Sequence, residues 1–233
     1  MILDSQPKRL SPVHARHQGL DAQFALQAGW QILEVYTTPA EERAAMQGSV
    51  GLADISAQGK LILKGTKVDG IINANLGKTP TRPGDVIEVQ SKHILVAKLT
   101  SDEYFILTPP DAEQEIETSL ETEIASQNTF VSVIDQTSGL VGLLIAGQKS
   151  VDVMKKLCAL DFNPTDFSNL HVAQSSFAKV RATIIRHDQD EMLAFELYAD
   201  RSYGIYLWDT LLDAGMEFDI QPIGWGTIRD TNI

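Results

Sequence analysis

Apolar residues in this chain occur in short runs, which predict β-strands separated by brief turns. The clearest runs lie at 59–65, 94–99, 104–108 and 140–146. Runs of this kind, bounded by glycine or polar residues, are typical of strands. Further strands are predicted at 85–90, 131–134, 179–185 and 193–198.

Helical periodicity predicts helices between these strands, at 14–26, 39–48, 66–76, 111–123, 148–160 and 201–214. The helix at 39–48 has the clearest start. Thr38 suits its N-cap and Pro39 its first position, and Glu41 and Glu42 in the first turn complement the helix dipole. Gly215 is a natural stop for the last helix.

The mixed order of strands and helices predicts an α+β fold rather than a doubly wound sheet. The segment 59–65 followed by Val68-Asp69 also resembles 142–147 followed by Val151-Asp152. Each segment is an apolar strand that ends in glycine, followed by a helix with valine-aspartate near its start. This internal similarity predicts two related strand–helix modules, and the alternative is a chance match.

Composition and charge narrow the class of protein. The chain has 233 residues, of which 43% are apolar and 21% charged, so it can bury a sizeable core as one large domain or two smaller ones. The net charge of −12, without a basic footprint, argues against nucleic-acid binding. No apolar run suits a membrane helix or a signal peptide, so we expect no membrane partner and a cytoplasmic location.

Other candidate sites were weighed and set aside. Cys158 is the only cysteine, which excludes an intrachain disulfide, and we expect a buried inert thiol. The acidic segment 111–123 is interpreted as a solvated helix face. His14 and His17 with Asp21 could form a metal face, but a further well-placed ligand is uncertain and no metal is predicted.

One carboxylate stands inside an apolar strand. Glu196 follows Phe195 and precedes Leu197 and Tyr198. Burying an unpaired acid costs several kcal/mol, so Glu196 either faces solvent or is held for a ligand or a cation. The pattern alone favours the solvent-facing alternative, because half of all strand positions face outward.

Four motifs occur in order within residues 11–65: Ser11-Pro12-Val13-His14-Ala15-Arg16-His17, Ala28-Gly29-Trp30, Glu42-Arg43 and Val50-Gly51-Leu52-Ala53-Asp54-Ile55-Ser56. Their order and spacing resemble the glycine-cleavage T-protein family, which comprises tetrahydrofolate-dependent aminomethyltransferases and relatives. Motifs of the second half are similar to the gamma subunit of heterotetrameric sarcosine oxidase, a shortened member of the same superfamily. They lie at 158–162, 166–167, 173–174, 201–203 and 206–208.

The resemblance implies an α+β fold of two interleaved ferredoxin-like units around a central folate channel. It implies a flexible N-terminus at 1–12 and a folate-binding region at 13–233, with approximate sub-units at 13–125 and 126–233. Full aminomethyltransferases carry a further C-terminal β-barrel domain. Since the chain stops at Ile233, we expect that barrel to be missing.

The resemblance also implies folate-binding residues. Glu196 occupies the position of the glutamate that grips the pterin ring, where a carboxylate can accept two adjacent N–H donors. Arg186 falls on the arginine that opens the same segment, and Arg229 matches a family arginine if the alignment slips by one residue. Trp225 lies on the same glycine-rich turn as Arg229 and is expected in the core or the channel wall. Surface positions for both arginines remain open alternatives.

The chain also departs from the family pattern. Active transferases carry an aspartate after a double glycine before the strand at 94–99, whereas Lys92 and His93 stand here. A cation cannot replace an acid that stabilises positive charge on a folate nitrogen. The turn before Glu196 is also changed, to His187-Asp188-Gln189-Asp190-Glu191.

Three functions are compatible with these sequence features. The first is a tetrahydrofolate-binding protein of one-carbon metabolism, in which the usual catalytic aspartate is missing and activity is uncertain. The second is a non-catalytic gamma-like subunit that docks on a larger flavoprotein. The third, a folate sensor or iron–sulfur maturation factor, is disfavoured because Cys158 lacks the lysine-glycine-cysteine context of that branch.

Overall fold

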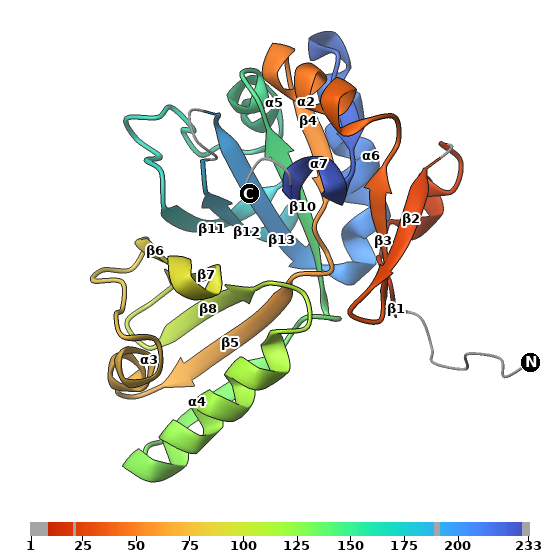
Figure 1. Cartoon of the computed structure of the whole chain (residues 1–233). Coiled ribbons are helices and arrows are strands. Elements are labelled where there is room, and N and C mark those ends of the chain that lie inside the picture. The colour runs from red at the N-terminus through yellow and green to blue at the C-terminus, as the bar shows by residue number, and fades with distance from the viewer. Residues whose placement is uncertain (1–8, 21, 189–191, 230–233) are drawn as a thin grey trace, which may run out of the picture.

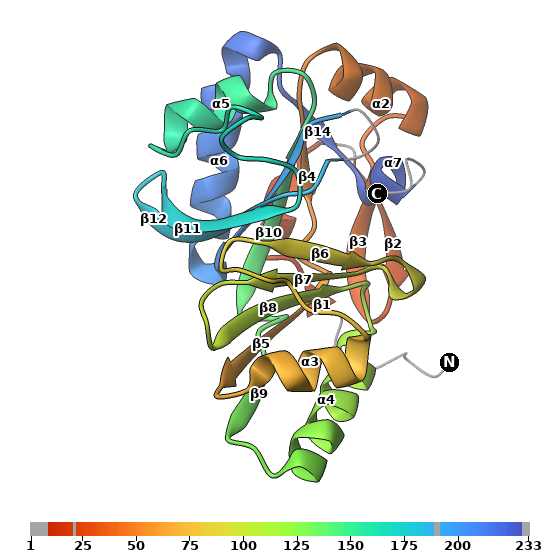
Figure 2. The ribbon, with the colours of Figure 1, turned by 90° about the vertical axis from the view of Figure 1, so that its left-hand side faces the viewer.

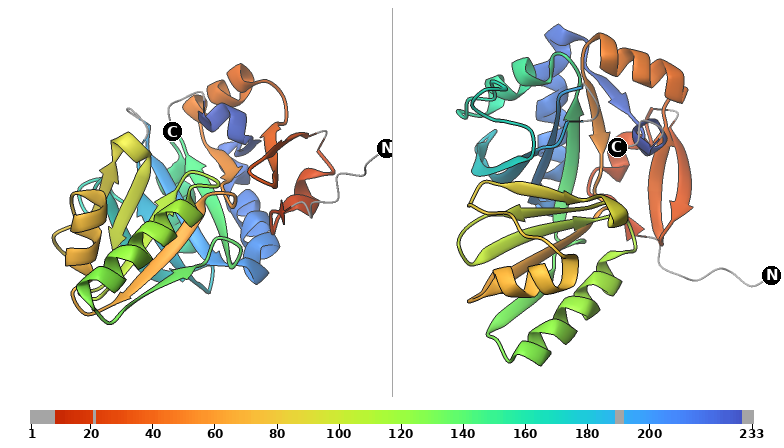
Figure 3. Two further views of the ribbon diagram at one scale, coloured as in Figure 1. Left: turned by 60° about the horizontal axis from the view of Figure 1, so that its bottom comes forward. Right: turned by 60° about the vertical axis from the view of Figure 1, so that its left-hand side comes forward.

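The computed structural model describes residues 9–20, 22–188 and 192–229. Two β-sheets pack face to face, and helices cover the outer face of each sheet (Figures 1 and 2). A smaller N-terminal sheet lies beside this sandwich (Figure 3). The predicted α+β class is therefore confirmed.

The lower sheet has five strands, and two helices cover it (Figure 1). Each strand is antiparallel to its neighbours. Because β5 is antiparallel to both β8 and β9, these two strands are parallel and the connecting helix α4 crosses β5. In spatial order the strands are β6 (Val86–Val89), β7 (Ile94–Lys98), β8 (Glu103–Thr108), β5 (Gly59–Gly65) and β9 (Val131–Asp135), covered by α3 (Val68–Leu76) and α4 (Glu113–Gln127).

The upper sheet has six strands, and its outer face is covered by α5 (Ser150–Leu157) and α6 (Gly204–Gly215). One of its strands, β4, precedes the lower sheet in the chain yet pairs here with β10. The two sheets are therefore interleaved in sequence. The spatial order is β11 (His171–Phe177), β12 (Val180–Arg186), β13 (Ala194–Asp200), β10 (Leu140–Ala146), β4 (Gly51–Asp54) and β14 (Gln221–Ile223).

The N-terminal sheet lies beside the two larger sheets (Figure 3), and its Arg9 contacts Glu113 of α4 at 3.4 Å. Arg16 makes two hydrogen bonds to Asp209 of α6, at 2.8 and 2.6 Å. The elements of this region are β1 (Arg9–Leu10), α1 (His14–His17), β2 (Gln23–Gln27), β3 (Trp30–Val35), α2 (Pro39–Gly48) and, from the C-terminal end, α7 (Trp225–Arg229). Short 3-10 helices complete the chain at Gln90–Lys92, Arg201–Tyr203 and Met216–Phe218.

The two similar segments of the sequence, 59–65 and 142–147, hold equivalent positions in the two larger sheets. Each sheet has a strand, β5 or β10, that ends at a glycine and leads into a helix, α3 or α5. Gly65 and Gly147 both have positive φ, at 147° and 128°. A Cβ atom at either glycine would lie within 2.4 Å of a backbone oxygen, so both positions require glycine.

Most predicted elements are present, with boundaries shifted by a few residues. Helix α2 begins as predicted: the Thr38 hydroxyl accepts a hydrogen bond from the Glu41 amide, and Pro39 is the first helical residue. The helix predicted at 14–26 is wrong, because only His14–His17 is helical and Gln23–Gln27 is a strand. That strand forms a hairpin with Trp30–Val35 through Ala28 and Gly29, both of positive φ, and this pairing outweighs the helical periodicity.

Two smaller expectations have different outcomes. Cys158 is buried at the end of α5, as expected. The acidic helix α4 is not only a solvated face, since its Glu113 is buried. Within the described residues, no helix is long and apolar enough to cross a membrane.

Candidate functional site

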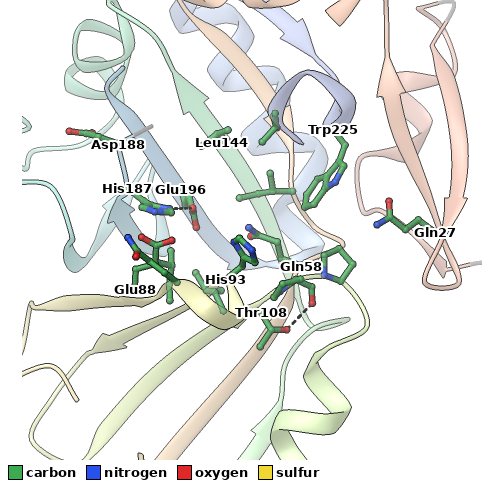
Figure 4. A pocket seen from close by; sticks show the side chains of 17 residues that line it. Gln27, Gln58, Glu88, His93, Thr108, Leu144, His187, Asp188, Glu196 and Trp225 are labelled. Atoms are coloured by element: carbon green, nitrogen blue, oxygen red, sulfur yellow. Dashed lines mark hydrogen bonds and ion pairs between the residues drawn. The ribbon is translucent and has the colours of Figure 1, made fainter. Parts of the chain in front are cut away.

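A cavity of about 520 Å³ opens between the two sheets, close to the N-terminal hairpin (Figure 4). Its volume is in the range of small-molecule sites. Apolar walls alternate with carboxylates, imidazoles and amides. The lining residues are Gln27, Ile55, Gln58, Glu88, Gln90, His93, Leu95, Leu107, Thr108, Pro109, Pro110, Leu144, His187, Asp188, Glu196, Trp225 and Ile228.

Glu196 forms the most buried acidic part of this wall. Strand β13 has β10 and β12 on its two sides, so its residues alternate between the helix-covered face and the face toward the lower sheet. Phe195 and Leu197 pack under the helices, and Glu196 takes the opposite face. Its side chain is 3% exposed. The solvent-facing alternative is therefore wrong for this residue.

Two neighbours hold the Glu196 carboxylate. The Tyr198 hydroxyl lies 2.5 Å from Oε2, and His187 Nδ1 lies 3.2 Å from Oε1. Burial raises the pKa of Tyr198 well above its usual value, and the Glu196 charge raises it further, so the hydroxyl keeps its proton and can donate it to the carboxylate. Figure 4 shows His187 and Glu196 facing each other at one side of the cavity.

Gln58 extends this hydrogen-bond network. Its side-chain amide lies 2.7 Å from the Tyr198 hydroxyl. Two acceptors, Gln58 Oε1 and Glu196 Oε2, face this hydroxyl, which has one proton and donates it to one of them at a time. Gln58, Tyr198, Glu196 and His187 thus lie in one continuous polar network along the wall.

His187 is the titratable partner in this network. Burial of its imidazole opposes protonation, but the hydrogen bond and charge of Glu196, aided by Glu88 and Asp188, raise its pKa above the usual value. Protonated His187 would partly neutralise the Glu196 carboxylate. The acceptor strength of this wall therefore depends on pH.

Arg186 supports the site from outside the cavity. Its guanidinium contacts Asp188 through Nε at 2.9 and 3.0 Å and through a second nitrogen at 2.5 Å. Its remaining nitrogen donates to the Phe167 carbonyl at 2.6 Å. Arg186 is buried and does not line the cavity. Arg186 therefore fixes Asp188, next to His187, and its role in ligand binding stays a prediction.

Trp225 forms the opposite wall, as Figure 4 shows. It packs against the cluster around Trp30, and its helix is anchored by Glu42 of α2. The Glu42 carboxylate accepts hydrogen bonds from the Gly224 amide at 2.8 Å and the Thr227 hydroxyl at 2.5 Å. It also accepts the Tyr36 amide at 2.6 Å. Glu42 is buried and holds the Trp225 wall, which the helix-dipole interpretation did not indicate.

The segment that departs from the family pattern also reaches the cavity. Glu88, Gln90 and His93 line it, whereas Lys92 is exposed and does not. His93 has φ of 51° at the turn between the 3-10 helix and β7. His93 thus contributes an imidazole to this part of the wall.

Lys60 lies behind the site and is fully buried. Its ammonium group donates to the carbonyls of Ser56 and Gln58, each at 2.8 Å. Burial lowers its pKa to about 8, although nearby carboxylates oppose the shift. The sequence pattern of β5 gave no indication of this buried cation, which fixes the backbone of the loop that carries Gln58.

The arrangement favours a ligand that donates hydrogen bonds. The lining includes three carboxylates, Glu88, Asp188 and Glu196, and neither lysine nor arginine. Across the described residues, no group of three or more His, Cys, Asp or Glu side chains could hold a metal ion. His17 instead contacts Asp54 at 3.1 Å and the Tyr36 hydroxyl at 2.7 Å.

Two predicted residues cannot be placed. The Arg229 side chain and all of Asp21 lie outside the described part of the structure. Of the four predicted folate-binding residues, Glu196 and Trp225 line the cavity, and Arg186 lies behind it.

The family model of the GCVT N-terminal domain matches residues 88–232. An aminomethyltransferase from Halothermothrix orenii is 24% identical over 95% of this chain and 63% of its own length, and one from Mycobacterium avium is 26% identical over 94% and 60%. The chain thus spans about three fifths of the length of these relatives.

Two solved structures share the fold. The glycine cleavage system aminomethyltransferase T from Bartonella henselae aligns with a TM-score of 0.76 and 16% identity, over 94% of this chain and 60% of that chain. A chain of the heterotetrameric sarcosine oxidase from Corynebacterium sp. U-96 aligns with a TM-score of 0.70 and 18% identity, over 90% and 96%.

Proposed function

Because this chain belongs to the family of the GCVT N-terminal domain, we propose that it binds tetrahydrofolate in the cavity beside Glu196. The observation that carries the proposal is the buried Glu196 carboxylate on the wall of a cavity of about 520 Å³. Its oxygens have lone pairs beyond those used by Tyr198 and His187, so it can accept two adjacent N–H groups of a pterin.

The other wall residues complete this proposed site. Trp225 offers a flat apolar surface opposite Glu196, which suits one face of a bicyclic ring. Asp188, which Arg186 holds, also accepts a hydrogen bond from the Ala194 amide at 3.2 Å. Arg229 remains a proposed binding residue on the strength of the resemblance alone.

We also propose that the chain consists of two interleaved ferredoxin-like units around this cavity. The proposal is supported by the repeated order of a strand, a helix, three strands and a second helix in 59–127 and 140–215. The cavity lies where the two units meet.

We further propose that the site binds folate without efficient aminomethyl transfer. His93 lies where an active transferase is expected to carry an acid, and an imidazole offers weaker support for positive charge on the folate nitrogen. We expect no turnover with a lipoyl-protein substrate. Transfer at a normal rate would contradict this part of the proposal.

Equilibrium titration with tetrahydrofolate tests the binding site. We expect micromolar binding by the wild type and at least about tenfold weaker binding by Glu196→Gln, which keeps the shape and loses the charged acceptor. Glu115→Gln, on the exposed face of α4, is the matched control and should bind like the wild type. If the wild type does not bind, the folate proposal fails.

A second function is favoured by one observation. The chain covers 96% of the aligned chain of a heterotetrameric sarcosine oxidase, compared with 60% of the aminomethyltransferase T chain. The alternative proposal is a gamma-like subunit of a larger flavin-dependent enzyme. Co-expression with a candidate flavoprotein should then yield a stable complex, whereas two proteins that elute separately would argue against it.

A further inference from the structure

A second cavity, of about 390 Å³, also lies between the two larger sheets and shares none of the residues that line the first. It lies beneath the β11–β12 hairpin, which Figure 2 shows on the side away from the N-terminal hairpin. The lining residues are Ile62, Leu99, Glu103, Phe105, Leu140, Gln174, Lys179, Val180, Arg181, Ala182, Thr183, Tyr198, Ala199, Asp200 and Tyr203.

The inner part of this cavity is apolar and rigid. The rings of Phe105 and Tyr198 meet edge to face, with centroids 5.2 Å apart, and Ile62 belongs to the same cluster. The Tyr198 ring is fixed because its hydroxyl is held by Gln58 and Glu196 on the far side. Phe105 and Tyr198 are each 2% exposed and form the floor, and the half-buried side chains of Ile62, Leu99 and Leu140 offer the apolar surface above it.

The rim carries two cations with unused charge. Lys179 and Arg181 are exposed, and neither forms an ion pair with a carboxylate within the described residues. The two acids of the lining are already engaged. Glu103 pairs with Lys64 at 3.0 Å, and Asp200 accepts the Ser202 amide at 2.8 Å and the Ser202 hydroxyl at 2.5 Å. Since Lys64 matches the charge of Glu103, the remaining charges of the lining are Lys179, Arg181 and Asp200, which leave a positive balance for an incoming anion.

The backbone that presents Lys179 has an unusual conformation. Phe177 pairs with Val180, which leaves Ala178 and Lys179 as a two-residue loop with φ of 47° and 67°. Loops of this kind favour Asn-Gly, and other residues pay a conformational cost. The Ala178 amide donates to the Leu157 carbonyl at 2.7 Å, and its carbonyl accepts the Tyr206 hydroxyl at 3.0 Å. The loop is therefore held through the Ala178 backbone, and Lys179 occupies a position that local preference does not favour.

We propose that this second cavity binds a small aromatic carboxylate. The aromatic body packs against Ile62, Leu99 and Leu140, and the carboxylate pairs with Lys179 and Arg181. This site is separate from the proposed folate site, since the Tyr198 ring stands between it and the Glu196 carboxylate.

The probe is 2-naphthoate, followed by its own fluorescence, with 2-naphthamide as the uncharged analogue. We expect saturable binding of 2-naphthoate at millimolar or lower concentration and at least about fivefold weaker binding of the amide. The double variant Lys179→Asn/Arg181→Gln should weaken 2-naphthoate binding about tenfold. Because asparagine suits the loop conformation better than lysine, this variant should remain folded.

Two controls separate this site from other causes. Arg82→Gln/Lys155→Asn removes the same net charge at exposed positions outside the cavity and should bind 2-naphthoate like the wild type. Glu88→Gln, which changes the lining of the first cavity at a residue that makes no hydrogen bond to Tyr198 within the described part of the chain, should also leave this binding unchanged. Equal loss in both double variants, loss in Glu88→Gln, or absence of saturable binding would overturn the proposal.

Discussion

The lower module, 59–135, and the upper module, 140–223, have the same order of elements but contribute different chemistry to the seam between them. The lower module places a buried cation, Lys60, against backbone carbonyls. The upper module places a buried acid, Glu196, on the wall of a cavity. Helix α2 packs against β4 and β14 of the upper sheet.

This difference shows how a repeated fold produces a one-sided site. The Lys60 ammonium of the lower module donates its hydrogen bonds to backbone carbonyls, so its role is structural. The acid of the upper module keeps acceptor capacity for a ligand, because only Tyr198 and His187 contact it among the described residues. Four changes test the two modules against each other.

The largest expected effect compares the two equivalent glycines. A Cβ at Gly147 would lie 2.4 Å from the carbonyl oxygens of Met46 and Ser49, so Gly147→Ala should lower the free energy of unfolding by about 3 kcal/mol or more. Gly65→Ala meets the Phe130 carbonyl at 2.1 Å, but β9 is an edge strand that can move, so its loss should be smaller.

Gly77→Ala is the control, because it has φ of 80° with nothing within 4 Å of the added Cβ. Its cost should be about 1 to 2 kcal/mol from the backbone conformation alone. Urea unfolding of the three variants gives the comparison. A Gly147→Ala protein as stable as Gly77→Ala would show that the α2 loop adapts freely.

The next effect concerns Lys60, whose pKa is lowered to about 8 by burial. The unfolded chain keeps this proton up to about pH 10.4, so between these values the unfolded state binds more protons and stability rises with pH. The rise attributable to Lys60 should be about 2 kcal/mol between about pH 7.5 and 9.5. Urea unfolding across this range should show it in the wild type and not in Lys60→Met. If the free energy of unfolding depends on pH in the same way in both proteins, Lys60 is not desolvated.

A smaller effect is expected at Glu42, which ties α2 and α7 together over the upper module. Glu42→Gln replaces an acceptor oxygen by an amide group that faces N–H and O–H donors, and should cost about 2 kcal/mol of stability. It should also weaken folate binding, because Trp225 loses its support. Glu41→Gln, on the exposed side of the same turn, should cost less than about 0.5 kcal/mol. Equal costs at the two positions would contradict this assignment.

The smallest effect sharpens the role of the upper module in ligand binding. The pKa of His187 is raised, despite burial, by Glu196, Glu88 and Asp188, so the imidazole is protonated below that pKa and reduces the acceptor strength of Glu196. Tetrahydrofolate affinity should therefore rise a few-fold, on the order of threefold, as pH increases through this pKa. The same pair stabilises the fold below about pH 6.5, and this contribution is lost as pH rises through the raised pKa.

Titrations of His187→Gln should show an affinity nearly independent of pH in this range. His171→Gln, which does not line the cavity, should keep the pH dependence of the wild type. A pH dependence that survives in His187→Gln would assign it to another group.

Local sequence features predicted local structure well. The start of α2 follows from Thr38 and Pro39, whose preferences act within one turn, and the strand β5 follows from its apolar run between two glycines. The error at 14–26 arises where helical periodicity conflicts with strand pairing. The periodicity of this segment is compatible with a helix, but pairing with Trp30–Val35 makes most of its second half a strand.

The candidate site was only partly predictable for the same reason. The resemblance identified Glu196 and Trp225, and the structure places both on one cavity. It also identified Arg186, but the neighbouring Asp188 engages the guanidinium and keeps it behind the wall. No local pattern indicated Glu42, Lys60 or Gln58, because their partners come from distant strands and loops.

The amino-acid sequence by itself determined the α+β class, most strands and helices, the two glycines of the repeat and the presence of one acid in an apolar strand. These properties depend on backbone preferences and on periodicity over a few residues. Only the tertiary structure decided that Glu196 faces a cavity and that Lys60 and Glu42 are buried. Orientation and burial depend on which sheet covers each face, and that is fixed by pairing between segments far apart in the chain.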